Sequence, residues 1–312
     1  MASAPLPTPA TPATPATPAD FDLQALISQL WIYPVKSCAG VAVSEVVLTE
    51  TGLEFDRAWM VVDEKSQFVT QRQLPRMCLI QPQLKHSEMV LRAPGMLALH
   101  IALDKVEQAC RAGVWGQDCA AYDMGDVAAQ WFTDFLMQER PVGMPAQQLR
   151  LVRFDPEHQR LSSTQWTNNV AALNQFSDGY PILVASQASL DGLNQRLAAQ
   201  GHAQVTLQRF RPNIVLTGIE AHDEDRSGAL HIATQEGSIA LALVKPCPRC
   251  PIPNVDPQTG IPSPEVGDTL QTYRQDARLQ GAVSFGMNAI TLSGVEQVLR
   301  VGQTVQGAWT FA

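Results

Sequence analysis

Leu30-Trp31-Ile32-Tyr33-Pro34-Val35 is a run of β-branched and aromatic side chains that predicts the first packed element of the fold, beginning near Leu26. Similar strand-forming runs recur at short intervals, at 41–43, 46–48, 59–62, 68–70 and 96–99. Turn-forming residues separate them, as at 63–66 and 93–95, which indicates hairpins rather than crossover helices. We therefore expect mainly antiparallel sheets.

Two stretches have the spacing of helices instead. The first begins at Asp126 and places apolar side chains on a single stripe, which predicts an amphipathic helix with Asp126 as its cap. The second runs from Ser186 to Ala199, with Leu190, Leu193 and Leu197 on one side. Neither helix carries a run of potential ligands, so we expect both to be packing elements.

The domain organisation follows from changes in composition. Residues 4–19 repeat Pro, Ala and Thr and are poor in large apolar side chains, so we expect a disordered leader at 1–24. A cluster of breakers at 141–145 marks a boundary between domains at 25–143 and 144–312. The tail from Asn288 returns to β character, and we expect the second domain to be a closed or nearly closed antiparallel barrel.

Composition and charge exclude several classes of protein. The chain has 312 residues, 45% of them hydrophobic, and a formal charge of −8 without a basic tract, so we do not expect nucleic acid as a partner. Its six cysteines are thinly spread, which favours a reducing, cytoplasmic location. No window approaches the roughly 18 consecutive apolar residues that a membrane span needs.

The densest special chemistry lies in Lys245-Pro246-Cys247-Pro248-Arg249-Cys250-Pro251-Ile252-Pro253. A dithiol switch of the thioredoxin type needs a helix after its first cysteine, and Pro251 and Pro253 prevent one. Structural zinc needs four ligands, but the chain has no second Cys-x-x-Cys and no paired histidines. Two readings remain: Cys250 is a thiolate favoured by Lys245 and Arg249 that binds a redox metal, or it is a cysteine that merely packs.

Two further groups of residues have the side chains of an anion-binding site. Arg211 and Asn213, in Phe210-Arg211-Pro212-Asn213, suit a phosphate or the edge of a heteroaromatic ring, although a surface ion pair before a strand would look the same. Lys36, Ser37 and Arg57 supply two cations and a hydroxyl near strand ends. Scattered surface charges would give the same pattern.

Taken in order along the chain, these segments resemble the MOSC superfamily, and within it the two-domain subgroup of the mitochondrial amidoxime-reducing component and its bacterial relatives. The resemblance runs from about Leu30 to Val305 and rests on Trp31-Ile32-Tyr33-Pro34-Val35-Lys36-Ser37, Asp56-Arg57-Ala58-Trp59, Phe210-Arg211-Pro212-Asn213 and Cys247-Pro248-Arg249-Cys250. It implies a mainly β (α+β) fold in which a MOSC β-barrel follows an N-terminal β-barrel-like domain, with a few packing helices.

The resemblance also implies a cofactor. A mononuclear molybdenum would be held by molybdopterin (Mo-MPT) and by Cys250, which would be both the metal ligand and the catalytic residue. Lys36, Ser37 and Arg57 would hold the phosphate end of the pterin, and Arg211, Asn213, Pro248 and Arg249 would line the rest. The chain departs from the family at Gly179, where only backbone contact is expected, and at Tyr180, a further candidate contact. It also departs at Asn288, which follows Phe285-Gly286-Met287 where the relatives carry an aromatic residue.

The function implied is the reduction of N-hydroxylated substrates such as amidoximes, hydroxylamines and N-hydroxylated bases. The electrons would come from a separate iron-sulfur, flavin or cytochrome partner, because no cysteines for a cluster follow the last strand. The alternative is a molybdenum-cofactor carrier or a sulfur-transfer protein in which Cys250 bears a persulfide. We expect no membrane partner in either case.

Overall fold

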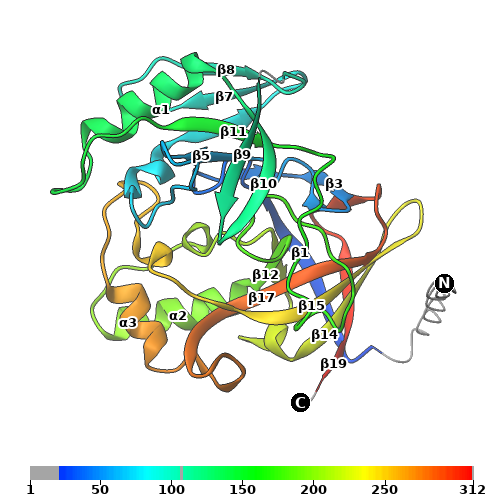
Figure 1. Ribbon diagram of the computed structural model, residues 1–312. Helices are drawn as coiled ribbons and strands as arrows, with labels where there is room; N and C mark the ends of the chain where they lie inside the picture. The colour runs from blue at the N-terminus through cyan, green and yellow to red at the C-terminus, as the bar shows by residue number, and fades with distance from the viewer. Residues whose placement is uncertain (1–20, 106–107, 311–312) are drawn as a thin grey trace, which may run out of the picture.

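The computed structural model describes residues 21–105 and 108–310 (Figure 1). Most of the expected leader, residues 1–20, lies outside the described residues. Figure 1 shows two parts, one above the other: a smaller upper part that carries α1, and a larger lower part built around long strands and covered by α2 and α3. The strands far outnumber the helices, which confirms the expected mainly β fold.

The lower part is a closed barrel of seven strands. Its order is β12-β13-β1-β19-β14-β15-β17, and a further pairing of β12 with β17 closes the ring. All of these pairings are antiparallel except that of β12 with β13, as the hairpin spacing predicts. The strands are β1 (Leu23–Ile32), β12 (Ile182–Ser186), β13 (Ile214–Thr217), β14 (Ser227–Ala233), β15 (Ser238–Pro248), β17 (Ala282–Ser293) and β19 (Thr304–Trp309). Two short strands extend it, β2 (Val41–Val43) beside β1 and β16 (Gln275–Asp276) beside β17.

The barrel takes one of its strands, β1, from near the start of the chain. In β1 the buried residues Leu23, Ala25 and Ile27 alternate with exposed ones, as a strand with one face on a core requires. They pack with side chains such as Leu230 and Leu241 from β14 and β15. Strand β1 starts three residues before the expected Leu26, because its first residues pair with β19 near the other end of the chain. The boundary expected at 143–144 stays a prediction, and the barrel draws on strands from both sides of it.

Within the described residues, the upper part has two small antiparallel sheets, of order β5-β11-β10-β9 and β6-β7-β8, and the helix α1. A third small sheet, of order β18-β3-β4, packs side chains such as Val46, Leu48 and Leu299 into the core of the barrel. Helix α1 packs its apolar stripe, including Phe132 and Phe135, against a core that contains Trp59 and Leu151. The strands are β3 (Glu45–Thr49), β4 (Gly52–Leu53), β5 (Trp59–Val62), β6 (Gln81–Leu84), β7 (Glu88–Arg92), β8 (Leu99–Ala102), β9 (Gln108–Val114), β10 (Gln117–Asp123), β11 (Arg150–Phe154) and β18 (Val298–Arg300).

Both expected helices are present, as α1 (Asp126–Gln138) and α2 (Gln187–Ala199). Ser186 caps α2 by accepting a hydrogen bond from the Ser189 amide, 3.1 Å away. The expected cap of α1 is wrong: Gly125 precedes the helix with φ 87°, and the Asp126 carboxylate instead accepts from Arg150 Nη2 at 3.0 Å. The short helix α3 (Glu265–Gln271) was not expected.

Two expected strands differ from the structure. Residues 68–70 form only an isolated bridge, between Phe68 and Val62, and β8 begins at Leu99 instead of Met96. Short 3-10 helices connect several elements, namely η2 (Pro75–Leu79), η3 (Leu207–Arg209), η4 (Asp223–Arg226), η5 (Ile252–Asn254) and η6 (Ala277–Leu279).

Candidate functional site

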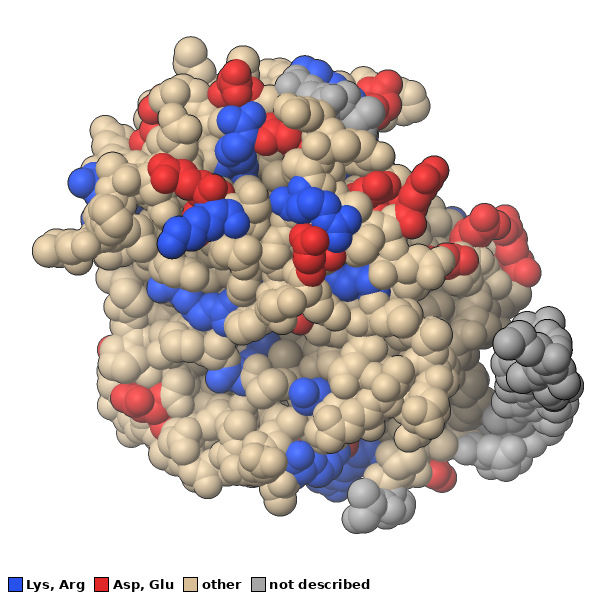
Figure 2. All heavy atoms as spheres, viewed as in Figure 1, with Lys and Arg blue, Asp and Glu red and all other residues tan. Residues whose placement is uncertain are grey.

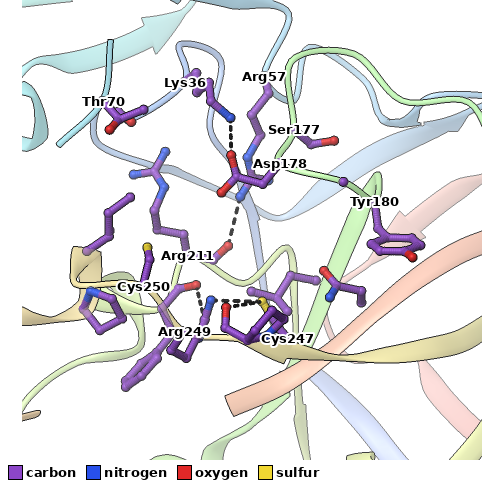
Figure 3. Close-up of a pocket in the computed structure, with 18 of the residues that line it drawn as sticks. Lys36, Arg57, Thr70, Ser177, Asp178, Tyr180, Arg211, Cys247, Arg249 and Cys250 are labelled. Carbon is purple, nitrogen blue, oxygen red and sulfur yellow. Dashed lines mark hydrogen bonds and ion pairs between the residues drawn. The ribbon is translucent and has the colours of Figure 1, made fainter. Parts of the chain in front are cut away.

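A cavity of about 420 Å³ lies where loops of the upper part meet one end of the barrel (Figure 3). Its walls come from the segments after β1, before β5, before β12 and before β13, and from the end of β15 and the loop that follows it. All eleven site residues expected from the sequence line this cavity. They are Lys36, Ser37, Arg57, Gly179, Tyr180, Arg211, Asn213, Pro248, Arg249, Cys250 and Asn288.

The cavity is strongly cationic in a chain that is acidic as a whole. Asp178 is the one carboxylate that lines it within the described chain, whereas seven lining residues are Lys or Arg, namely Lys36, Arg57, Arg72, Arg209, Arg211, Lys245 and Arg249. Figure 2 shows Lys and Arg side chains around the hollow between the two parts of the molecule. Because clustered charges in a concave, low-dielectric site focus the electric field, this cavity attracts an anionic ligand.

Three of the lining residues have a backbone conformation that non-glycine residues rarely adopt. Ser37 has φ 68°, Arg57 has φ 51° and Arg211 has φ 59°, all in the left-handed region. Each such residue costs of order 1 kcal/mol and persists only where the surroundings enforce it. Their concentration at one cavity is typical of a binding site.

Asn213 connects three segments beneath the cavity. Its Oδ1 accepts from Arg57 Nη1 at 3.0 Å and from the Leu183 amide at 3.0 Å, and its Nδ2 donates to the Trp31 carbonyl at 3.1 Å. Arg57 also donates to the Asp56 carboxylate and, through Nη2, to the Arg211 carbonyl at 3.1 Å. Asn213 therefore orients Arg57 and the loop that carries Arg211.

Two arginines have buried donors with no hydrogen-bond partner in the described part of the chain. Arg211 stacks over the Tyr33 ring at 4.2 Å and donates through Nη1 to the Cys38 carbonyl at 2.6 Å, whereas its buried Nη2 has no hydrogen-bond partner among the described residues. Nε of Arg249 is likewise buried without a partner in the described chain. Burial, reinforced by Arg57, lowers the pKa of Arg211 to about 10, so it stays charged at neutral pH. Since buried donors are normally bonded, these atoms fit an anionic or polar ligand.

The two cysteines of the Cys-x-x-Cys segment differ. The Cys247 sulfur accepts from Arg249 Nη1 at 3.2 Å, and burial raises the pKa of this thiol although Arg249 opposes the shift. The Cys250 sulfur has no hydrogen-bond partner within the described residues, and Figure 3 shows it facing the cavity. No group of three or more His, Cys, Asp or Glu side chains in the described part of the chain could hold a metal ion. A metal bound by Cys250 would therefore need its other ligands from a cofactor.

The ammonium group of Lys36 is hydrogen-bonded within the protein. Its Nζ donates to the Phe176 carbonyl at 2.7 Å and to Asp178 Oδ1 at 2.5 Å. Burial lowers the pKa of Lys36, while Asp178 acts in the opposite direction. The ammonium group thus reaches the cavity as one half of an ion pair, which the sequence did not indicate.

Sequence reasoning missed two residues that shape this side of the cavity. Arg160 is buried and donates to the Asn174 side chain at 2.5 Å and to the carbonyls of Gln175 and Ser177 at 2.6 and 2.7 Å, so it braces the segment before Asp178. Trp115, in the turn between β9 and β10, donates from Nε1 to Asp178 Oδ1 at 3.1 Å. Neither residue lies in a recognisable motif, and only their long-range contacts reveal them.

Comparison with known proteins accounts for both parts of the chain. Residues 24–139 match the MOSC N-terminal beta barrel domain, and residues 173–306 match the MOSC domain. The chain is 36% identical over 297 residues to mitochondrial amidoxime reducing component 2 of Rattus norvegicus, covering 89% of this chain and 82% of that protein. This chain belongs to the MOSC-domain family.

Further relatives are named for two different activities, amidoxime reduction and sulfuration of the molybdenum cofactor. Mitochondrial amidoxime-reducing component 1 of Homo sapiens is 37% identical over 258 residues, covering 80% of this chain and 72% of that protein. Molybdenum cofactor sulfurase of Bos taurus is 30% identical over 271 residues, covering 82% of this chain but 30% of that protein. The family resemblance seen in the sequence is confirmed.

Within the described residues of this MOSC chain, no helix is long and apolar enough to span a membrane.

Proposed function

We propose that this protein is a molybdenum-cofactor oxidoreductase that reduces N-hydroxylated substrates. The observation that carries the proposal is one cavity that is lined both by seven cationic side chains and by a cysteine whose sulfur has no partner among the described residues. The kinship with proteins named for amidoxime reduction supports the substrate class. The cofactor is Mo-MPT.

The residues around the cavity fit that cofactor. The donors of Arg211 and Arg249 that have no partner among the described residues suit an anionic or heteroaromatic group, and Arg57 adds a third guanidinium beside Arg211. Cys250 supplies the single soft thiolate that a redox metal needs from the protein. Asn213 has its polar atoms bonded within the protein, so its role is to position Arg57 and not to contact the ligand itself.

When bound, a molybdenum-pterin group supplies two-electron chemistry with transfer of an oxygen atom. The chain's own residues do the rest. The fixed cations Arg57, Arg211 and Arg249 offset the negative charge of the ligand without reorganising. The hydrogen-bonded loop that ends at Asp178 keeps the opposite wall in place. Electrons come from a separate iron-sulfur, flavin or cytochrome protein.

The decisive experiment measures turnover on protein of known metal content. Protein expressed with an intact cofactor pathway and shown to hold molybdenum should reduce benzamidoxime to benzamidine with reduced methyl viologen as artificial donor. Molybdenum-loaded protein that reduces no amidoxime, hydroxylamine or N-hydroxylated base under these conditions would overturn the proposal.

A second candidate function is sulfur transfer, favoured by the match to molybdenum cofactor sulfurase. In that case Cys250 would carry a persulfide, which mass spectrometry of the intact protein would detect as one added sulfur atom. A persulfide on Cys250 together with absent turnover would favour this candidate.

The cellular location stays a prediction. The sequence favours the cytoplasm, whereas several relatives have the word mitochondrial in their names.

A further inference from the structure

Asp178 has the opposite charge to the other ionisable side chains that make the cavity cationic. Among the described residues that line the cavity it is the only carboxylate, and seven others are cationic. Its side chain is 57% exposed although it lies in a concave site, because it points into the open space of the cavity (Figure 3). A carboxylate at an anion-binding wall repels the anion, so its position calls for a reason beyond cofactor binding.

The two carboxylate oxygens of Asp178 have different surroundings. Oδ1 accepts from Lys36 Nζ at 2.5 Å and from Trp115 Nε1 at 3.1 Å. Oδ2 has no hydrogen-bond partner among the described residues. The ion pair with Lys36 thus explains one oxygen, and the other remains free to accept a hydrogen bond from a ligand.

The segment that carries Asp178 is rigid. Arg160 is 4% exposed and donates to the carbonyls of Gln175 and Ser177, while Ser177 Oγ donates to the Asn174 side chain at 3.1 Å. An acceptor that is fixed before the ligand arrives loses little entropy on binding. Lys36 also keeps the pKa of Asp178 below its usual range, although desolvation acts in the opposite direction, so the carboxylate is charged at neutral pH.

We propose that Asp178 determines substrate specificity: its free Oδ2 accepts a hydrogen bond from the amino group of amidine-type N-hydroxylated substrates. This inference rests on the proposed function and narrows it. Amidoximes and N-hydroxyguanidines carry an N–H donor on the carbon next to the N–OH group, whereas N-oxides and oximes of simple aldehydes do not. Asp178 and Cys250 line the same cavity, so one small ligand can face both residues.

The chemistry of the reduction strengthens this contact as it proceeds. The balanced reaction is R–C(NH2)=N–OH + 2 e⁻ + 3 H⁺ → R–C(NH2)2⁺ + H2O, with the electrons from the external donor. The N–O bond breaks, its oxygen leaves as water, and the nitrogen is protonated. An amidine is a much stronger base than its amidoxime, so positive charge develops on the N–C–N unit. A fixed carboxylate stabilises that charge in the transition state more than in the substrate.

The first test needs no variant. Benzamidine and benzamide have the same size and shape, but only benzamidine is a cation with donors on both nitrogens. We expect benzamidine to inhibit benzamidoxime reduction with an inhibition constant at least about tenfold below that of benzamide, as a charge-assisted hydrogen bond implies. Equal inhibition by the two compounds would overturn the inference.

The second test locates the effect. Asp178→Asn keeps a hydrogen-bonding side chain beside Lys36 but removes the charge, and benzamidine affinity, measured by calorimetry on molybdenum-loaded protein, should fall about tenfold while benzamide affinity stays unchanged. Asp256→Asn is the matched control, because Asp256 pairs with another cavity cation, Arg209, at 2.9 Å but does not line the cavity. It should leave the benzamidine preference intact.

The outcomes separate the inference from the proposed function. If Asp178→Asn loses affinity for both compounds alike, or keeps the preference for benzamidine, Asp178 does not select substrates. If the variant does not fold or does not retain molybdenum, the comparison of benzamidine with benzamide on the wild-type protein decides. Loaded wild-type protein that reduces amidoximes without this preference refutes the inference alone, whereas the absence of all turnover refutes the proposed function.

Discussion

The barrel and the cavity at its end differ in how completely their polar groups are hydrogen-bonded within the described chain. Barrel strands such as β14 and β15 pair in regular ladders and turn fully buried side chains such as Leu230 and Leu241 inward. The cavity loops hold non-glycine residues with positive φ, and arginines with unpartnered donors. The comparison teaches that the barrel supplies the stability that keeps the less favourable loop conformations in place.

The largest effect should come from the barrel core. Leu230→Ala removes a fully buried side chain and should lower the free energy of unfolding by about 2–5 kcal/mol. Leu97→Ala is the control, because Leu97 is 89% exposed, and it should change stability by less than about 0.5 kcal/mol. Chemical denaturation of the cofactor-free protein measures both. Similar losses of stability in the two variants would contradict the claim that the barrel core supplies the stability of the fold.

A smaller effect should come from His222, an unsatisfied group outside the cavity. Its Nδ1 is buried without a partner in the described chain, and burial, reinforced by Arg274, lowers its pKa from 6.5 to about 3. The unfolded state therefore binds the proton first, and stability falls as pH decreases from about 6.5 towards 3. Screening at this partly accessible site reduces the effect to roughly 2 kcal/mol.

His222→Asn should reduce that loss of stability with acidification, and asparagine tolerates the φ of 68° at this position. Denaturation midpoints at a series of pH values measure the slope. His86→Asn is the control, because His86 is exposed, and it should behave as the wild-type protein does. If stability depends on pH in His222→Asn as steeply as in the wild-type protein, groups other than His222 cause the pH dependence.

The smallest effect should come from the cavity backbone. Ser37→Gly relieves a φ of 68° and should stabilise the cofactor-free protein by about 0.5 kcal/mol, while it lowers cofactor retention. Gln280→Gly relieves a φ of 57° at the end of η6, at a residue that does not line the cavity, and should stabilise the protein equally without changing cofactor retention. Destabilisation by Ser37→Gly alone would show that the cavity backbone is not strained.

Local patterns in the sequence predicted much of the fold. The alternation and turn residues predicted antiparallel hairpins, and the apolar spacing predicted the start of α1 and both ends of α2 within a residue of their observed bounds. The pairing of β1 with β13 and β19 was not predictable, because it joins residues that are far apart in the chain. The seven-residue helix α3 is too short to give a clear period.

The candidate site was predictable in membership but not in its internal bonds. The motifs named residues that all line one cavity, Cys250 and Arg211 among them. They did not indicate that Lys36 is paired with Asp178, that Asn213 holds Arg57, or that Arg160 braces the loop. These contacts depend on how loops from distant parts of the chain meet at the barrel end.

The central claim is that Cys250, and not its neighbour Cys247, binds the metal of the cofactor. Elemental analysis of molybdenum in the wild-type protein, Cys250→Ala and Cys247→Ala, expressed side by side with an intact cofactor pathway, tests it most directly. We predict that Cys250→Ala loses most of its molybdenum while Cys247→Ala retains molybdenum at close to the wild-type level. Equal molybdenum content in the two variants would contradict the assignment.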